Sequence, residues 1–356
     1  MKIIKIPKYL FELITGKRQI YFSIKKNEKI KNFGKFLLEN NFSIKNDNDK
    51  KYKKLIAVDG IAAFAGSSAI TDFFAEFSNC TSLGGVDELE NPERGINNSF
   101  EFDFFRDYNG LYNLEKICDF DSNRILNGCI RDFIQIVKNN YYSGISFYGE
   151  FYLSCTQKFL KKILDFYYEE NEKENIYFVK KINLVQYRNY ANEYITSMLN
   201  NIPSQDFLVL DNICSISNPK NDVLFDYFGE YKIITSIRDP RDLYTAAMIY
   251  PNISFIPKDP YLFSKYYKWY VDRYKFQNNK NVLLIRFEDF VNNYDNTSSK
   301  IIKFCGLDTR DHIKRFMYFD IKKSRNNIGI YKNYKDQEAI KIIEQELQEY
   351  LYIDCK

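Results

Sequence analysis

A glycine-containing loop followed by two serines is the first segment whose residue types could carry chemistry. Residues 60–68 read Gly-Ile-Ala-Ala-Phe-Ala-Gly-Ser-Ser and lie between a short apolar run and a helical pattern. Backbone N–H groups at a helix N-terminus, together with hydroxyl groups and small residues, suit an anionic phosphate. The loop differs from the nucleotide-binding pattern GxxxxGK followed by Ser or Thr, because five residues separate its glycines and Ser67 replaces the lysine. The loop therefore indicates a phosphate-binding site, but the missing lysine argues against hydrolysis of ATP or GTP. An ordinary helix cap is the structural alternative.

Arg238 is the second candidate, in the segment Ile-Arg-Asp-Pro-Arg-Asp-Leu-Tyr at 237–244. It follows an apolar run typical of a strand, and ligands of open parallel sheets bind beyond the carboxyl ends of the strands. Arg238 is thus placed to reach a second anionic group. Pro240 suits the first turn of the helix expected next, where its missing N–H costs nothing. A purely structural pair of Arg238 with Asp242 is the alternative.

Two later segments add cationic and polar residues. Residues 282–290 read Val-Leu-Leu-Ile-Arg-Phe-Glu-Asp-Phe, and a helical pattern that ends in Phe-Cys-Gly-Leu follows at 304–307. Residues 324–333 form a polar stretch that holds Arg325 and Lys332 before the last helical pattern. These two cations could bind an anion, and an exposed basic loop is the alternative.

The elements that must position these residues follow from the hydrophobic pattern. Four short runs, each with an apolar stretch of three or more residues or β-branched residues, predict buried strands at 54–59, 207–212, 232–238 and 282–287. Amphipathic spacing predicts helices near 67–77, 239–248, 261–274, 297–304 and 336–351. Strands alternating with helices imply an α/β fold, with a parallel sheet flanked by helices on both faces. Residues 80–112 read as an irregular segment, and a loop of that length is usually functional.

The chain divides by pattern into a basic N-terminal extension and one α/β domain. We expect residues 1–53 to form a basic helical extension, with short helices over residues 9–42 and a break at 32–34. Residues 54–356 should form the α/β domain, with a helical insert at about 113–200. Residues 1–54 hold 15 Lys/Arg and 5 Asp/Glu. This segment could bind the anionic inner face of a membrane, or it could be a solvated pair of basic helices. Nucleic-acid binding is not expected, because no recognition module accompanies the charge.

Composition excludes several classes of protein. The 356 residues are 45% hydrophobic and 28% charged, which are globular proportions that exclude wholesale disorder and a fibrous protein. No apolar run reaches the ~18 residues that a membrane-spanning helix needs, and scattered charges at the start argue against a secretory signal. We therefore expect a cytoplasmic protein. Seven singly spaced cysteines and one histidine, His312, predict no metal site.

Taken together, the order and spacing of the four segments resemble the sulfotransferase family that uses 3′-phosphoadenosine 5′-phosphosulfate (PAPS). The resemblance covers about residues 54–350 and is most specific in its last third. It implies the P-loop-like sulfotransferase fold, PAPS as co-substrate and no metal. The bacterial-looking composition and the large insert favour the carbohydrate type, whose acceptor would be a hydroxyl of a cell-surface polysaccharide or of its precursor.

The resemblance also implies which residues would bind the 5′-phosphosulfate. In this chain they are Ala65, Gly66, Ser67, Ser68 and Ala69. The basic residue that the family places just before its loop is replaced by Phe64. We expect Arg106 to supply the cation that polarises the sulfuryl group.

The resemblance implies that the 3′-phosphate would be bound by the Arg238 segment and by the late segment 324–333. Arg238 matches the family's arginine, whereas the helix-side serine falls on Ala246, with Thr245 beside it. A late loop would close over the same phosphate through Arg325, Gly329 and Lys332. Tyr331 stands where the family usually has Trp.

The catalytic base is expected in the segment after the first helix. Glu101 lies in Ser-Phe-Glu-Phe-Asp-Phe-Phe-Arg, where surrounding aromatic rings would desolvate the carboxylate and raise its pKa. Glu88, Asp103 and His312 are the alternates. A structural pair of Glu101 with Arg106 is the other interpretation.

Two other functions compete with sulfuryl transfer. A P-loop-type kinase or phosphotransferase is disfavoured by the missing lysine, and Asp211 is its only tolerable metal-binding candidate. A non-catalytic nucleotide-binding protein that keeps the fold is supported by the substitutions at Phe64 and Ala246.

Overall fold

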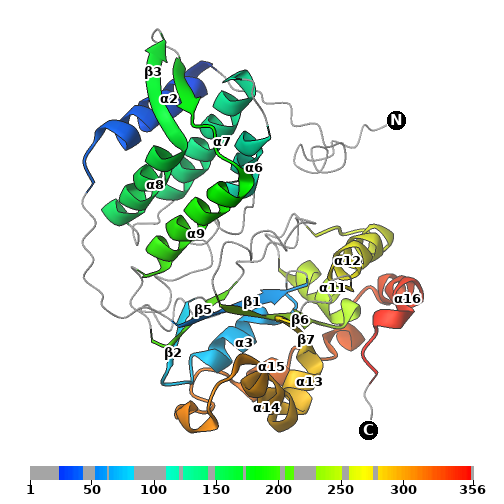
Figure 1. Cartoon of the computed structure of the whole chain (residues 1–356). Coiled ribbons are helices and arrows are strands. Elements are labelled where there is room, and N and C mark those ends of the chain that lie inside the picture. Colours follow the sequence, from blue (N-terminus) through cyan, green and yellow to red (C-terminus); the bar gives the residue numbers. More distant parts are fainter. Residues whose placement is uncertain are drawn as a thin grey trace, which may run out of the picture.

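The computed structural model describes most of the chain. The described residues are 24–42, 53–61, 64–83, 110–119, 123–142, 149–170, 174–200, 205–211, 230–250, 256–275 and 280–353. They form a parallel sheet with its covering helices and a second, mainly helical unit, both labelled in Figure 1.

Five strands form one parallel sheet. They are β1 (Lys54–Gly60), β2 (Cys80–Leu83), β5 (Phe207–Asp211), β6 (Tyr231–Ile237) and β7 (Val282–Arg286). Their order is β2-β5-β1-β6-β7, and each neighbouring pair is parallel. The predicted α/β class is confirmed, and the bounds of the four predicted strands agree with the structure to within one residue.

The edge strand β2 is absent from the sequence prediction, which treats all of residues 80–112 as irregular. That prediction is wrong for Cys-Thr-Ser-Leu at 80–83, which pairs with 207–210 of β5. A strand this short and polar has no apolar run to mark it. It is fixed by tertiary contacts, among them a hydrogen bond from Ser82 Oγ to the carbonyl oxygen of Thr71 at 2.9 Å.

Helices cover both faces of the sheet because alternate residues of each strand point to opposite sides. One face is covered by α3 (Ser67–Phe74), α13 (Phe287–Asn292) and α14 (Tyr294–Cys305). In β1, Ile56 and Val58 belong to the core on this face, whereas Leu55 and Ala57 belong to the core on the other. A strand buried on both sides explains the continuous apolar run.

A third hydrophobic cluster lies beyond the end of β6. It involves α11 (Pro240–Ile249), α12 (Pro260–Lys275) and α16 (Gln337–Glu346). The remaining short elements near the C-terminus are α15 (Ile321–Arg325), η3 (Thr309–Asp311), η4 (Ile330–Asn333) and η5 (Gln348–Tyr350). The last predicted helix, 336–351, is therefore split into α16 and the 3₁₀ turn η5.

The second unit packs on the sheet face opposite α3. It contains α2 (Ile24–Glu39), α6 (Leu111–Glu115), η2 (Lys116–Cys118), α7 (Asn123–Tyr142), α8 (Gly149–Ile163), α9 (Leu184–Asn200), β3 (Leu164–Glu170) and β4 (Glu174–Val179). Its buried residues form one core with Leu55 and Ala57 of β1. Figure 1 shows this unit on the side of the sheet opposite α3. The N-terminal helix α2 takes part in this core through Ile30, Phe33 and Leu37.

Two predictions for this part of the chain are wrong. The insert is not purely helical, because β3 and β4 form an antiparallel hairpin. Exposure alternates along part of β3, where Phe166 and Tyr168 are more than half exposed and Tyr167 between them is partly buried. Helix α2 also runs without a break through 32–34. Gly34 allows close packing there, because a Cβ would lie 2.5 Å from Tyr177 Oη.

None of the helices in the described segments combines the length and the apolar character of a membrane span.

Candidate functional site

The loop between β1 and α3 is shaped by two residues with positive φ. Phe64 has a φ of 64° and Gly66 a φ of 93°. Gly66 is the N-cap residue of α3, and no side chain caps the helix. The first N–H groups of α3 thus lack a side-chain acceptor, which is the arrangement that binds anions at helix N-termini.

Gly66 is required at this position because Phe287 lies against its Cα. A Cβ would come within 2.8 Å of Phe287 Cγ and closer still to Cδ2. Phe287 starts α13 directly after β7. The segment 282–290 therefore helps to position the loop, a role that its sequence alone does not indicate.

Arg238 joins this loop to the late loop, residues 325–332. Its Nη1 donates a hydrogen bond to the carbonyl oxygen of Phe64 at 3.0 Å, and its Nη2 donates to the carbonyl oxygen of Asn327. The guanidinium also lies 5.4 Å from the centroid of the Phe287 ring. The three predicted segments therefore meet at the carboxyl-terminal edge of the sheet, where Gly60 of β1 pairs in register with Ser236 of β6.

The Arg238 side chain is deeply buried. Only 5% of the residue is exposed, and its Nε has no hydrogen-bond partner in the described part of the chain. Burial lowers the pKa of Arg238 from its usual value, and the nearby carboxylates of Asp242 and Glu288 oppose that shift. Arg238 thus places positive charge beneath the two loops.

Asp242 holds the late loop through its backbone. Its carboxylate accepts hydrogen bonds from the N–H groups of Gly329 at 2.7 Å and Tyr331 at 3.2 Å. Gly329 has a φ of 76°, which suits glycine. Burial raises the pKa of Asp242, although these hydrogen bonds and Arg238 favour the ionised form. The sequence alternative that pairs Arg238 with Asp242 alone is therefore too simple, because each binds a loop.

In the segment 237–244, Arg241 is the arginine that forms ion pairs with carboxylates. It pairs with Asp239 at 2.6 Å and with Glu344 of α16 at 2.8 Å. Its guanidinium lies 4.0 Å from the centroid of the Tyr331 ring. These contacts attach α16 and the late loop to the start of α11.

Arg325 and Lys332 are the exposed cations of the site. Neither has a carboxylate within ion-pair distance among the described residues. Both flank Gly329 on the late loop, whose residue Asn327 accepts a hydrogen bond from Arg238.

The other predicted contacts are less accessible. Thr245 is fully buried in α11, and its Oγ1 has no partner among the described residues. Ala65 and Ala69 are 3% and 8% exposed, so only their backbone groups could serve a ligand. Ser67 and Ser68 are half-buried at the start of α3.

The predicted catalytic pair lies outside the described residues. This holds for Glu101 and Arg106 and for the alternates Glu88 and Asp103. Their roles stay predictions.

His312, the remaining alternate base, has a structural environment. Its Nε2 lies 2.7 Å from Oε2 of Glu76, a fully buried residue, and its ring stacks on Phe77 at 4.4 Å. Glu76 follows the C-terminal end of α3, roughly 13 Å along that helix from Ser67. His312 therefore lies at the opposite edge of the sheet from the loop, and the structure removes it as a candidate base.

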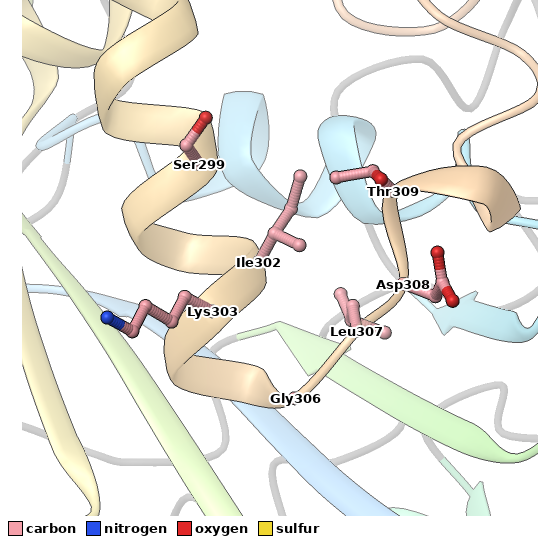
Figure 2. A pocket seen from close by; sticks show the side chains of 7 residues that line it. All are labelled: Ser299, Ile302, Lys303, Gly306, Leu307, Asp308 and Thr309. Atoms are coloured by element: carbon pink, nitrogen blue, oxygen red, sulfur yellow. The ribbon is translucent and has the colours of Figure 1, made fainter.

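A hollow of about 490 Å³ lies at this opposite edge. It is lined by Ser299, Ile302, Lys303, Gly306, Leu307, Asp308 and Thr309 (Figure 2). The neighbouring carbonyl oxygen of Cys305 accepts a hydrogen bond from Lys54, the first residue of β1. The hollow is thus separate from the Arg238 junction. Among the described residues, no group of three His, Cys, Asp or Glu side chains could hold a metal ion.

Comparison with known proteins gives structural similarities only. No protein-family model and no curated protein sequence matches the chain. The sulfotransferase domain from the curacin biosynthetic pathway has a TM-score of 0.39 and 11% identity, and covers 86% of this chain and 100% of its own. The sulfotransferase domain of the Synechococcus PCC 7002 olefin synthase has a TM-score of 0.38, 11% identity, and coverages of 86% and 98%. Sulfotransferase STF9 from Mycobacterium avium has a TM-score of 0.36, 10% identity, and coverages of 86% and 79%. Scores of this size carry no functional argument, so function has to be argued from the site.

Proposed function

We propose that the chain is a sulfotransferase that takes its sulfuryl group from PAPS and transfers it to a hydroxyl of a carbohydrate. The observation that carries the proposal is the junction at Arg238, whose guanidinium hydrogen-bonds to both loops. The order of motifs along the chain, which resembles that of PAPS-dependent sulfotransferases, supports it independently.

The donor needs two separate anion sites, because PAPS carries a 5′-phosphosulfate and a 3′-phosphate. The uncapped N-terminus of α3, with the hydroxyls of Ser67 and Ser68, suits the first. Arg325 and Lys332 suit the second, with the buried charge of Arg238 between the two sites. One PAPS molecule that spans both anion sites would replace the contacts by which Arg238 now joins the loop after β1 to the late loop.

The chemistry asks the protein for positioning, for positive charge near the sulfuryl oxygens and for a base at the acceptor hydroxyl. We assign the base to Glu101 and the polarising cation to Arg106, on the sequence argument alone. A carbohydrate acceptor, a polysaccharide or its precursor, is proposed on the same ground.

Phosphoryl transfer is the weaker alternative. Asp211 ends β5 opposite Val58 of β1, so an acidic residue does lie at the same edge. However, the loop offers no lysine to a β- or γ-phosphate. A binding protein without catalysis is the third reading, supported by Phe64 at the cation position.

Calorimetric titration of the full chain separates the three. We expect 3′-phosphoadenosine 5′-phosphate to bind and ATP with magnesium not to bind. Tighter binding of ATP would favour a phosphotransferase, and binding of neither would overturn the nucleotide site. Sulfate transfer from PAPS to a panel of glycans then tests the acceptor, and bisphosphate binding without transfer to any glycan would favour the binding protein.

Matched variants locate the site. Arg325→Ala and Lys332→Ala should each weaken bisphosphate binding roughly tenfold, the usual worth of a charge-assisted hydrogen bond. Lys335→Ala, which removes an exposed lysine three positions further on, is the control and should bind as the wild type does. Equal losses in all three variants would indicate general electrostatic attraction and would contradict the assigned site.

A further inference from the structure

A loop at the amino-terminal edge of the sheet gathers large apolar side chains on the surface. Ile313 is 65% exposed, Phe316 48% and Met317 66%. These three, within five positions, are the densest group of exposed large hydrophobic side chains in the described part of the chain. Groups of this kind often mark an interaction site. We call residues 313–317 the apolar loop.

The apolar loop is fixed from beneath by Glu76. The Glu76 carbonyl oxygen accepts a hydrogen bond from the N–H of Lys314 at 3.1 Å. Its buried carboxylate accepts from the N–H groups of Tyr318 at 3.2 Å and Phe319 at 2.9 Å, and contacts His312. The exposed side chains therefore stand on an ordered base, and less conformational entropy is lost when they bind.

Phe316 adds a second observation. Its φ of 62° is an unfavourable backbone conformation for a bulky side chain. The ring lies 4.8 Å from the Arg315 guanidinium and 5.1 Å from the Tyr294 ring centroid, yet about half of the residue stays exposed. A strained backbone that holds an aromatic ring at the surface favours a function for that ring outside the protein.

Cations surround these apolar side chains. Residues 308–323 hold five Lys/Arg and three Asp. Two nearby carboxylates are already paired: Asp308 with Arg310 and Asp295 with Arg315. Lys314 and Lys322 are exposed beside the apolar loop, so the surface keeps a net positive charge.

We propose that the apolar loop and its flanking cations dock this protein on an anionic phospholipid surface. Exposed Ile, Phe and Met side chains would enter the boundary between headgroups and acyl chains, while lysines and arginines meet the anionic headgroups. This combination of apolar side chains with positive charge fits lipid better than an acidic protein face, which would leave Ile313 and Met317 without apolar partners.

The docked orientation would leave the nucleotide site free. The apolar loop follows Asp311, whose carbonyl oxygen accepts from the N–H of Ser78 just before β2. Strands β1 and β6, of seven residues each, separate this edge from the Arg238 junction by roughly 20 Å. The proposal therefore stands or falls independently of the proposed catalysis.

Vesicle flotation of the full chain tests the proposal. Vesicles of phosphatidylcholine with phosphatidylserine should bind the wild type, and those of phosphatidylcholine alone should bind it more weakly. The double variant Ile313→Ser with Met317→Ser should reduce the bound-to-free ratio about tenfold. The control, Leu184→Ser with Val185→Ser, removes two exposed apolar residues from the start of α9 and should bind as the wild type does.

A charge variant tests the second half of the surface. Lys314→Ala should weaken binding to the phosphatidylserine vesicles about fivefold and leave binding to the neutral vesicles unchanged. Thermal unfolding and bisphosphate binding should be unchanged in these variants, which keeps a folding defect apart from a docking defect. Three results would overturn the proposal: no vesicle binding by the wild type, equal losses in the Leu184/Val185 control, or full binding by the Ile313/Met317 variant. The last would assign any lipid contact to another segment.

Discussion

Arg238 Nη1 donates a hydrogen bond to the carbonyl oxygen of Phe64 at 3.0 Å, although 174 positions separate the two residues in the chain. This bond connects the end of β6 to the loop that follows β1. The same guanidinium binds Asn327 of the late loop. One buried side chain thus determines how two candidate anion-binding segments lie relative to each other.

Replacing Arg238 should therefore affect stability as well as binding. Arg238→Ala leaves the carbonyl oxygens of Phe64 and Asn327 without this donor, and should lower the free energy of unfolding by about 2–4 kcal/mol. Arg238→Lys keeps the charge but not the planar fork that reaches both oxygens, so it should recover only part of the loss. Urea denaturation measures both. A lysine variant as stable as the wild type would contradict the bridging role.

Gly66 and Gly128 offer a matched pair of glycine substitutions. Gly66→Ala places a Cβ against Phe287 at a φ of 93° and should cost at least about 1–3 kcal/mol of stability. Gly128 lies within α7, where a Cβ would meet nothing within 4 Å. Gly128→Ala should therefore stabilise by about 0.5–1 kcal/mol. Melting temperatures that move in the same direction for both variants would contradict this account of Gly66.

Glu288 predicts a component of pH-dependent stability. Its Oε1 accepts from the N–H of Asp239 at 2.7 Å, while Oε2 has no hydrogen-bond partner in the described part of the chain. Burial raises the pKa of Glu288 above its ordinary 4.5. The folded state therefore holds this proton more tightly than the unfolded state, and stability falls as pH rises from 4.5 through the folded pKa.

Glu288→Gln isolates that component. The amide keeps an acceptor for Asp239 but cannot ionise, so the variant should gain stability relative to the wild type as pH rises from acid to neutral. Asp242, whose pKa is also raised, contributes equally to both proteins and drops out of the difference. Chemical denaturation across this range gives the difference directly, and a constant value would show that Glu288 does not titrate differently in the two states.

Glu76 should be the main anchor of residues 312–319. Glu76→Ala removes the acceptor for the N–H groups of Tyr318 and Phe319 and the contact with His312. It should destabilise the protein by about 3–5 kcal/mol, because these groups share one fully buried carboxylate. Glu76→Gln should retain much of the stability. Amide exchange at Tyr318 and Phe319 should accelerate more than exchange in β1, and uniform acceleration would instead indicate a global effect.

Glu101 provides the test of catalysis. Glu101→Gln should lower the rate of sulfuryl transfer by about 10²–10⁴-fold, the usual range for a positioned base, and leave bisphosphate affinity nearly unchanged. Asp103→Asn, two positions away, is the matched control. Full turnover in the Glu101 variant with loss in the control would move the base to Asp103.

Much of the sheet could be predicted from sequence because its signals are local. The predicted strands at 54–59 and 207–212 contain the continuously apolar stretches 55–58 and 207–210, as buried parallel strands require, and the structure places them side by side. The helix that begins at Pro240 could also be predicted, because proline suits the first turn of a helix. In the structure, the side chain of Asp239 caps this helix by accepting a hydrogen bond from the N–H of Arg241 at 2.8 Å.

Tertiary structure decided what local pattern does not carry. Residues 80–83 form a strand because they pair with β5. Gly34 lies inside a continuous helix, where the absence of a side chain leaves room for Tyr177. His312 contacts Glu76 and lies far from the loop between β1 and α3, although the sequence around His312 does not indicate this position. The order of the motifs along the chain predicted which residues belong to one site. Their convergence on Arg238 depends on contacts between positions 64, 238 and 327, and such long-range contacts form only when parallel strands bring their carboxyl ends to the same edge.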